Sequence, residues 1–569
     1  MYLQVGNNKG RKYLSIVQGY RDPDTKKVRH KTIKSLGYLD DLKEEYEDPI
    51  AHFKAVAEEM NKKAALEKEP VKLEIDPQKK LTESPANRKN IGYAALSRLY
   101  HELGLHIFFY NHSRSFQSKF NTNNIMKLLV FSRILAPASK KKTYEQKENY
   151  FENTDFSLDD LYRCLTQVVT MKAGLQLHLH RQMKAKFNRN TELVYYDVTN
   201  YYFEIDEPDE LRKKGVSKEH RPDPIIQMGL LMDTKGIPIC YDLFPGNTND
   251  CETLMPVLDK VKKNYGVGRT IIVADKGVNT ADNIAFSLAK GDGYIYSQTV
   301  RGANKELKNY VLDPSGYREL TDDYKIKSRL YPREIAVSNA TGGRSKIRID
   351  EKQVVFYSSD YDRKAKIERE PALLKARDLA KNPSKYNKAT SYGAAKYLKN
   401  LVFDPKTGQI ITAKQKPVFD ENKLREEEKF DGYYAIVTSE WQKKDEEIID
   451  IYRGLWKIED AFKVTKSDLG ARPVYLSRQD HIEAHFLICF IALVIARLLV
   501  LQLSNKFSVP KIVESLNKAS GTRLEENWFV FNHKDEVTSA VGKLLDVDLS
   551  RKYLKLGEIK KILGATKKT

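Results

Sequence analysis

Several common signatures are missing from this chain of 569 residues. The four cysteines are scattered and form no CxxC pair, which argues against a zinc site or a disulfide framework and predicts a reducing compartment. No GxxxxGK[ST] motif occurs, so we expect no P-loop for ATP. No internal repeat, low-complexity array or sustained heptad run is visible, which gives no support for a coiled-coil zipper.

A secretion signal is missing as well, because the opening MYLQVGNNKGRKYL has no apolar core. The one long apolar run, FLICFIALVIARLLVLQL at 486–503, is nearly long enough to span a bilayer. Arg497 lies well inside this run, and a charge at the centre of a bilayer is costly. We therefore interpret the run as a buried helix of a large domain and expect no membrane partner.

Positive charge is abundant: 97 Lys and Arg outnumber 77 Asp and Glu, for a net charge of +20 and a pI of about 9.3. This balance favours a polyanionic partner, with nucleic acid ahead of a membrane surface; a merely soluble basic protein is the alternative. Hydrophobic residues make up 41% of the chain, enough to bury a core, and the length exceeds what one core usually serves.

Composition and periodicity divide the chain into seven regions. We expect strands and a helix that bind DNA (1–60), a linker (61–90), a helical domain that binds DNA ends (91–187), the first part of an α/β core (188–300), a basic insertion with strands (301–430), the second part of the core (431–503), and a C-terminal region considered for dimerisation or DNA contact (504–569). In the core, the expected order from residue 193 to 300 is β-β-β-α-β-α-β.

Two short basic stretches are candidate DNA contacts. In KKVRHKTIK, Arg29 and Lys31 alternate with other residues, so on a strand they share one face, which is either a phosphate-facing strip or a solvated surface. The run Lys140, Lys141 and Lys142 follows a predicted helix that stops at a proline.

Three acidic residues occupy unusual places. Asp197 lies within a strand, where aspartate is disfavoured, and Asp275 ends the apolar strand IIVAD. On a single helix from about 446 to 470, Glu459 falls on the same arc as Leu455 and Phe462, which predicts a carboxylate on the face that packs against the sheet. A buried carboxylate needs a cation, so the three acids predict a site for two Mg²⁺ ions, with Mn²⁺ able to substitute.

These residues resemble bacterial insertion-sequence transposases of the DDE type, in the subgroup with the signature Y-x2-R-x3-E-x6-K. Tyr452, Glu459 and Lys466 match this signature in identity and spacing, whereas Leu455 stands at the arginine position. Arg453 and Lys457 are displaced around the helix and are no simple substitutes. The sequences GNTND, DKG and RPVY…HIEAH are also similar to this group.

The resemblance implies an α/β fold: a ribonuclease H-like mixed sheet flanked by helices, with a β-containing insertion before the last catalytic helix, beside a small N-terminal β/α region and a helical domain. It implies that Asp197, Asp275 and Glu459 form the catalytic, metal-binding triad. It also implies that Tyr452 and Lys466 contact phosphates at the transposon end.

The implied activity is cut-and-paste transposition. The enzyme would bind the terminal inverted repeats of its element, cleave the ends by Mg²⁺-dependent hydrolysis and join the 3′-hydroxyl to target DNA. We expect a homodimer in the synaptic complex and a location in the bacterial cytoplasm at the nucleoid. The alternatives are a catalytically idle, transposase-derived repressor and a ribonuclease H-like nuclease without strand transfer.

Overall fold

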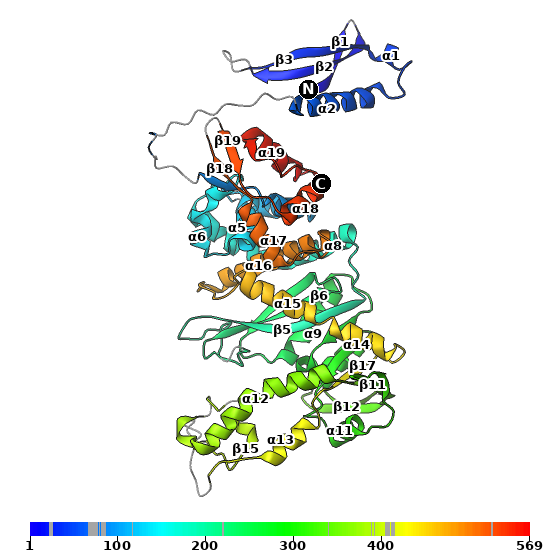
Figure 1. Cartoon of the computed structure of the whole chain (residues 1–569), viewed down its shortest axis with the longest axis vertical. Helices are drawn as coiled ribbons and strands as arrows, with labels where there is room; N and C mark the ends of the chain where they lie inside the picture. The colour runs from blue at the N-terminus through cyan, green and yellow to red at the C-terminus, as the bar shows by residue number, and fades with distance from the viewer. Residues whose placement is uncertain are drawn as a thin grey trace. The chain divides into compact units, whose positions relative to one another are not determined.

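The computed structural model describes residues 1–568 apart from 9, 22–26, 67–77, 79, 81–86, 117, 219–220, 340, 388–389, 392, 404–409, 411–415 and 525–526. The chain forms two compact units, Met1–Glu83 and Ser84–Thr569, each with its own hydrophobic core (Figure 1). Most of the expected linker at 61–90 lies outside the described residues.

The first unit is a three-stranded antiparallel sheet with two helices. The strands are β1 (Tyr2–Asn8), β2 (Arg11–Arg21) and β3 (Val28–Tyr38), in the order β1-β2-β3, and the helices are α1 (Leu39–Leu42) and α2 (Pro49–Leu66). The carboxylate of Asp48 accepts a hydrogen bond of 3.0 Å from the backbone N–H of Ala51, so Asp48 caps α2 with proline at the first helical position.

Helices dominate the beginning and the end of the second unit. The early helices are α3 (Ala94–Glu102), α4 (Leu105–Ser113), α5 (Thr122–Leu135), α6 (Lys140–Glu145), α7 (Leu158–Thr170) and α8 (Lys172–Phe187). The C-terminal elements are α17 (Val509–Lys518), β18 (Ser520–Arg523), β19 (Trp528–Phe531), α18 (Glu536–Leu545), β20 (Tyr553–Lys555) and α19 (Leu556–Ala565). A sheet of order β20-β19-β18-β4 joins them to β4 (Arg88–Asn90), so the C-terminal region packs with the early helices in one core.

The apolar run forms most of α16 (Gln479–Gln502), which packs against α3, α5 and α7 and against β7 of the central sheet. Among the described residues this is the one helix long and apolar enough to cross a membrane, and 83% of its most apolar window is buried inside the protein. Arg497 pairs with Asp460 across 2.7 Å, which gives the charge within the run a partner from another helix.

A nine-stranded mixed sheet forms the centre of the second unit. Its first five strands are β5 (Leu193–Tyr202), β6 (Ile225–Asp233), β7 (Pro238–Pro245), β8 (Ile271–Ala274) and β9 (Gly293–Gln298). They lie in the order β7-β6-β5-β8-β9, with β5, β6 and β7 antiparallel and β5, β8 and β9 parallel. This arrangement confirms the expected ribonuclease H-like fold.

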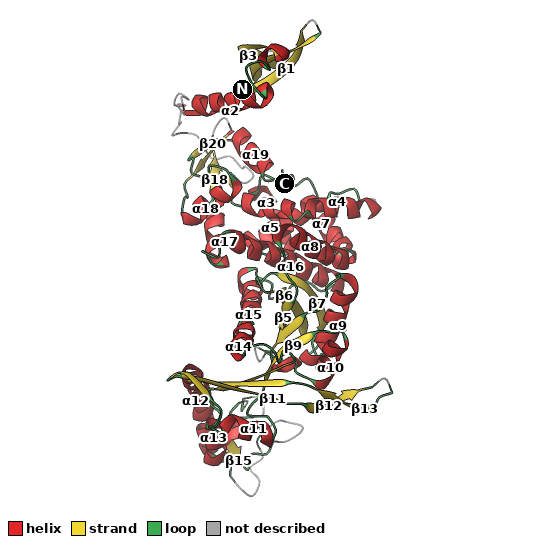
Figure 2. Cartoon of the chain, turned by 90° about the vertical axis from the view of Figure 1, so that its right-hand side faces the viewer, coloured by secondary structure: helices red, strands yellow, loops and turns green. Residues whose placement is uncertain are grey.

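Helices cover both faces of this sheet (Figure 2). On one face lie α9 (Asp250–Asn264) and α10 (Ala281–Ala289), and on the other lie α14 (Asp445–Arg453) and α15 (Trp456–Lys463). The even-numbered residues of β5, such as Tyr196, point to α9, and Tyr195 points to α14. Asp197 has the same parity as Tyr195 and therefore belongs to the α14–α15 face.

The insertion at 301–430 is continuous with the sheet. Its strands β10 (Arg318–Thr321), β11 (Tyr324–Leu330) and β14 (Lys352–Ser358) extend the sheet beyond β17 (Tyr433–Thr438), in the order β10-β11-β14-β17-β9. The remaining elements are α11 (Lys305–Leu312), the hairpin β12 (Arg333–Ser338) and β13 (Arg344–Ile349), α12 (Ser359–Lys381), β15 (Leu398–Lys399), β16 (Val418–Phe419) and α13 (Glu421–Glu428).

The expectation of one uninterrupted helix around Glu459 is wrong. The chain forms α14, a tight turn at Gly454 and Leu455, α15, and then a π-helical turn at Val464–Asp468. Through the tight turn, backbone hydrogen bonds reach back three residues, from Leu455 to Tyr452 and from Ile458 to Leu455. This overwinding changes the phase of the helix, so Leu455 and Phe462 are buried whereas Glu459 is exposed.

Candidate active site

Asp197 and Asp275 lie at the same level on two neighbouring parallel strands. In the register of β5 and β8, Tyr196 pairs with Ala274, so Asp197 is the next residue of β5 and Asp275 directly follows the end of β8. Neighbouring strands are about 4.8 Å apart, which brings two carboxylates from distant parts of the sequence together. The structure therefore joins two of the three predicted acids by backbone topology alone.

Two hydroxyl groups hold the Asp275 side chain. Ser297, on β9, donates a hydrogen bond of 2.6 Å to Oδ1 of Asp275, and Tyr452, on α14, donates one of 3.3 Å to the same atom. Burial, followed by the charge of Asp275, raises the pKa of Tyr452 above its usual range, so this hydroxyl remains a donor. The resemblance implied a DNA phosphate as the partner of Tyr452, and in the structure its hydroxyl contacts the Asp275 carboxylate.

The Asp197 carboxyl group lies in an environment that disfavours its charge. Burial raises its pKa to about 6, and the charges of Asp275 and Asp250 act in the same direction. Lys218 and the backbone N–H of Val198, which donates a hydrogen bond of 2.7 Å to Oδ1, oppose this shift. A divalent cation bound beside these carboxylates would offset the repulsion between their negative charges.

Sequence reasoning missed two members of this group, Asp250 and Lys218. Asp250 is the first residue of α9, and Asn249 occupies the N-cap position before it. Burial raises the pKa of Asp250, with Lys218 opposing and Asp275 adding to the shift. The Nζ atom of Lys218 lies 3.9 Å from Oδ2 of Asp250 and donates a hydrogen bond to the carbonyl of Val198. The GNTND and DKG motifs were the available signals, since a Cβ on Gly277 would lie 3.6 Å from Oδ2 of Asp250.

Glu459 lies on the same side of the sheet but is exposed. Burial, followed by Tyr361, raises the pKa of Tyr434 on β17, and the charges of Asp275 and Glu459 act in the same direction. The turn before the helix of Glu459 approaches β5 closely because Gly454 has no Cβ. A Cβ at this position would lie 2.0 Å from the Tyr195 hydroxyl. The expectation of a carboxylate on the packed face is therefore wrong, although its helix lies beside the strand of Asp197.

The three acids have suitable chemistry for Mg²⁺, but their side chains do not form a complete set of ligands in the structure. Within the described residues, no group of three or more His, Cys, Asp or Glu side chains could hold a metal ion. Oxygen ligands are nevertheless what Mg²⁺ prefers, and Asp197 and Asp275 are adjacent. Asp197 and Asp275 therefore present carboxylate oxygens that suit a divalent cation.

The predicted basic contacts divide into exposed and enclosed side chains. The Nζ atom of Lys466 lies 5.6 Å from the ring centre of Tyr201, towards the end of β5. Arg29 and Lys31 are exposed on β3 of the first unit. Lys141 and Lys142 are also exposed, but Lys140 is only 4% exposed, because the three lysines begin α6 and its first turn directs Lys140 inward.

The position of the signature arginine carries an apolar side chain, Leu455. Leu455 is buried. Arg453 pairs with Asp450 at 3.5 Å and lies over the ring of Tyr324, and Lys457 donates a hydrogen bond of 2.6 Å to the carbonyl of Thr234. The contacts of Arg453 and Lys457 are therefore with groups other than Asp197, Asp275 and Glu459.

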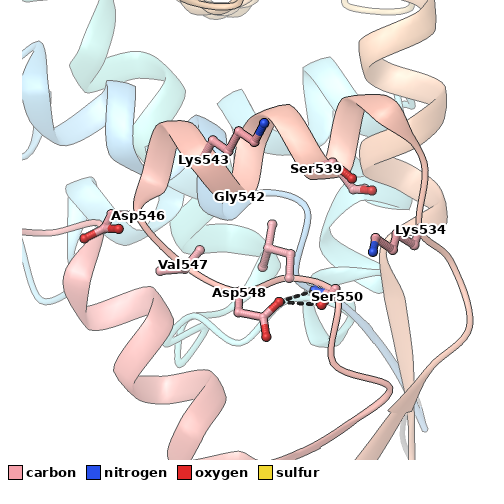
Figure 3. Close-up of a pocket in the computed structure, with 10 residues that line it drawn as sticks. Lys534, Ser539, Gly542, Lys543, Asp546, Val547, Asp548 and Ser550 are labelled. Carbon is pink, nitrogen blue, oxygen red and sulfur yellow. Dashed lines mark hydrogen bonds between the residues drawn. The ribbon is translucent and has the colours of Figure 1, made fainter. Parts of the chain in front are cut away.

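A pocket of about 400 Å³ lies elsewhere, between α18 and the loop that follows it (Figure 3). Lys534 and Lys543 line it together with Asp546 and Asp548. The carboxylate of Asp548 is already satisfied by the backbone N–H and the hydroxyl of Ser550, at 2.9 and 2.6 Å. The pocket carries two lysines and two aspartates, and the Asp548 carboxylate already accepts two hydrogen bonds. It therefore offers no unpaired group of acids like Asp197 and Asp275.

Comparison with known proteins gives two family matches. The transposase DDE domain matches residues 210–495, half of the chain, and includes Asp275 and Glu459 but begins after Asp197. The N-terminal domain of the IS1634 family transposases matches residues 4–70. A cryo-EM structure of a piggyBac transposase synaptic complex with hairpin DNA is similar over 83% of this chain and 85% of that chain, with 8% identity and a TM-score of 0.34, too low to support an argument. Comparison with curated protein sequences gives no match.

Proposed function

The chain belongs to the transposase DDE domain family, and from this we propose that it cleaves the ends of its own DNA element and joins them to target DNA. The observation that carries the proposal is the pair Asp197 and Asp275 on adjacent parallel strands, faced by the helix of Glu459. We propose that these three residues are catalytic and bind the metal ions.

Divalent ions, two Mg²⁺ with Mn²⁺ as a substitute, would polarise the scissile phosphate and lower the pKa of the attacking water or hydroxyl when bound. The contribution of the chain is to position the carboxylates. Ser297 and Tyr452 fix Oδ1 of Asp275, and the backbone N–H of Val198 fixes Oδ1 of Asp197. No histidine is required as a base in this arrangement.

The DNA partner is supported by the charge of +20 and by the family match. We propose that the terminal inverted repeats and the target DNA contact the protein through Lys466, Tyr452 and the basic residues Arg29, Lys31, Lys140, Lys141 and Lys142. Tyr452 can reach a phosphate only by leaving Asp275. Pairing two ends calls for a homodimer, and the substrate places the enzyme at the bacterial nucleoid.

The test is a cleavage assay on a duplex that carries the inverted repeats flanking the gene. With Mg²⁺, the wild type should nick the repeat ends and yield strand-transfer products, and EDTA should abolish both. Asp197→Asn, Asp275→Asn and Glu459→Gln should each lose cleavage but bind the duplex within about twofold of the wild type, because the binding surface is unchanged. Asp159→Asn, at an exposed position on α7, is the matched control.

Each other outcome has a distinct meaning. Full cleavage by any one of the triad variants would remove that residue from the proposed triad. Binding without cleavage by the wild type would indicate a repressor. Cleavage without strand transfer would indicate a nuclease of ribonuclease H-like fold.

A further inference from the structure

A cavity of about 290 Å³ lies between the helices of the second unit and the segment that follows the π-helical turn. It is bordered by residues 133–141, between the end of α5 and the start of α6, and by residues 470–476. Four cationic side chains line this basic cavity: Arg133, Lys140, Lys141 and Arg472. No Asp or Glu is among the described residues that line it.

Two of the four cations form its buried wall. Arg133 is 5% exposed and Lys140 is 4% exposed. The Nζ atom of Lys140 lies 3.2 Å from Nδ1 of His485, which is also buried. Arg133 donates hydrogen bonds to the carbonyls of Leu469, Gly470 and Ala138, but its Nε–H has no acceptor. In the described part of the chain no carboxylate pairs with Arg133, Lys140 or Lys141, so only carbonyl and imidazole dipoles face these charges.

Burying Arg133 and Lys140 without a neighbouring anion costs free energy of folding. Burial, and after it the charge of Arg133, lowers the pKa of Lys140 far below its usual range. An apolar side chain of similar length could fill the same wall without this cost, because buried charges are expensive unless they are paired. A negative group in the basic cavity would offset the positive charge of both residues and supply an acceptor for Arg133.

The position of the cavity indicates which anion this is. Arg472, at its rim, lies 5.8 Å from the ring of Tyr202, the last residue of β5, and Lys466 lies over the preceding Tyr201. Tyr202 is five residues beyond Asp197, or about 16 Å along an extended strand. A DNA strand covers that distance in about five nucleotides of B-form rise. Tyr475, which is 74% exposed, adds a ring on which a base can stack.

We propose that a backbone phosphate of the DNA held at the Asp197–Asp275 site occupies the basic cavity, between Lys140, Lys141 and Arg472. This assignment rests on the proposed function insofar as DNA is the ligand. It divides the three consecutive lysines of α6: Lys140 forms the wall and Lys141 the rim, whereas Lys142 lies 3.7 Å from Glu145 and does not line the cavity.

The experiment measures binding of a fluorescein-labelled duplex carrying the terminal inverted repeat, by anisotropy over a series of KCl concentrations. Lys140→Met keeps the length of the side chain and removes the charge, and Lys141→Ala changes an exposed position, so both variants should fold. Each should bind about threefold to tenfold more weakly and reduce the salt slope by about 1, as expected for the loss of one phosphate contact. Lys518→Ala, at an exposed lysine of α17 that pairs with Glu514, is the control and should match the wild type.

Wild-type affinity and salt slope in both Lys140→Met and Lys141→Ala would overturn the assignment. It would also be overturned if inorganic phosphate raised the Tm of the wild type but not of Lys140→Met while the two bound the duplex equally, since the cavity would then hold a free anion. The Asp197→Asn variant, measured in parallel, distinguishes failure of the phosphate assignment from failure of the proposed function. Cleavage by that variant would refute the triad and leave the comparison of the lysines intact.

Discussion

The hydroxyl of Tyr452 donates a hydrogen bond of 3.3 Å to Oδ1 of Asp275, an atom that Ser297 also contacts at 2.6 Å. The signature tyrosine and the second acid of the proposed triad are therefore in direct contact in the folded chain. Tyr452→Phe keeps the ring and removes one donor to a charged acceptor, an interaction worth about 1.5–3 kcal/mol. We expect cleavage of bound duplex to slow by about tenfold and the Kd to change by less than twofold.

Single-turnover cleavage and anisotropy binding, measured on the same preparation, check this prediction. Ser297→Ala serves as a second probe of the same carboxylate and should show the same split between rate and affinity. A loss of affinity with an unchanged rate of cleavage would show instead that the Tyr452 hydroxyl acts on a DNA phosphate.

The contact between Gly454 and Tyr195 fixes the distance from the α14–α15 turn to β5. In Gly454→Ala, the new Cβ would lie 2.0 Å from the Tyr195 hydroxyl and 3.0 Å from the Ile451 carbonyl, so either the turn or the Tyr195 side chain must shift. We expect a loss of about 1–3 kcal/mol in stability, seen as a lower Tm, together with loss of cleavage. Gly557→Ala is the control, because a Cβ there meets nothing within 4 Å. Adding Tyr195→Phe to Gly454→Ala should recover part of the Tm; no recovery would contradict a steric cause.

Asp197 should make the stability of the metal-free protein depend on pH. Its pKa is about 6 in the folded chain against 3.8 for an ordinary aspartate, so the folded state holds the proton more tightly than the unfolded state. Stability should therefore fall as the pH rises from about 4 to about 6 and change little above that. In EDTA, Asp197→Asn should exceed the wild type in stability above pH 6 by up to about 3 kcal/mol, and the gain should vanish below pH 4.

Tm measurements from pH 4 to pH 8 in EDTA test this expectation. The exposed Glu459→Gln variant should follow the wild type across the range. A gain for Asp197→Asn that grew towards acid pH would have the wrong sign and would show that the carboxylate is stabilised in the fold.

Asp250 and Lys218 should tune metal affinity in opposite directions. Asp250 adds negative charge near Asp197 and Asp275, whereas Lys218 lies 3.9 Å from Asp250 as a competing cation. We expect the apparent Kd for Mn²⁺, from Tm shifts or calorimetry, to rise by about threefold to tenfold in Asp250→Asn and to fall by a similar factor in Lys218→Met, because each substitution changes the charge beside Asp197 and Asp275 by one unit. Equal affinities in both variants would place the ions elsewhere.

Local sequence patterns were sufficient to predict the order of strands and helices in the core. Alternating and continuous apolar runs indicated the β-β-β-α-β-α-β order, and the strand positions of Asp197 and Asp275 followed from it, because each depends on neighbours a few residues away. The apolar run around Arg497 was correctly read as a buried helix.

Only the tertiary structure decided how these pieces meet. A helical wheel assumes uniform winding, but the tight turn at Gly454 and Leu455 interrupts the helix, and Glu459 is exposed. Asp250 lies near Asp197 and Asp275 because segments far apart in the sequence pack together. For the same reason Lys140 lies in the wall of the basic cavity. Periodicity states which way a residue faces on its own element, but strand pairing and helix docking decide what it faces.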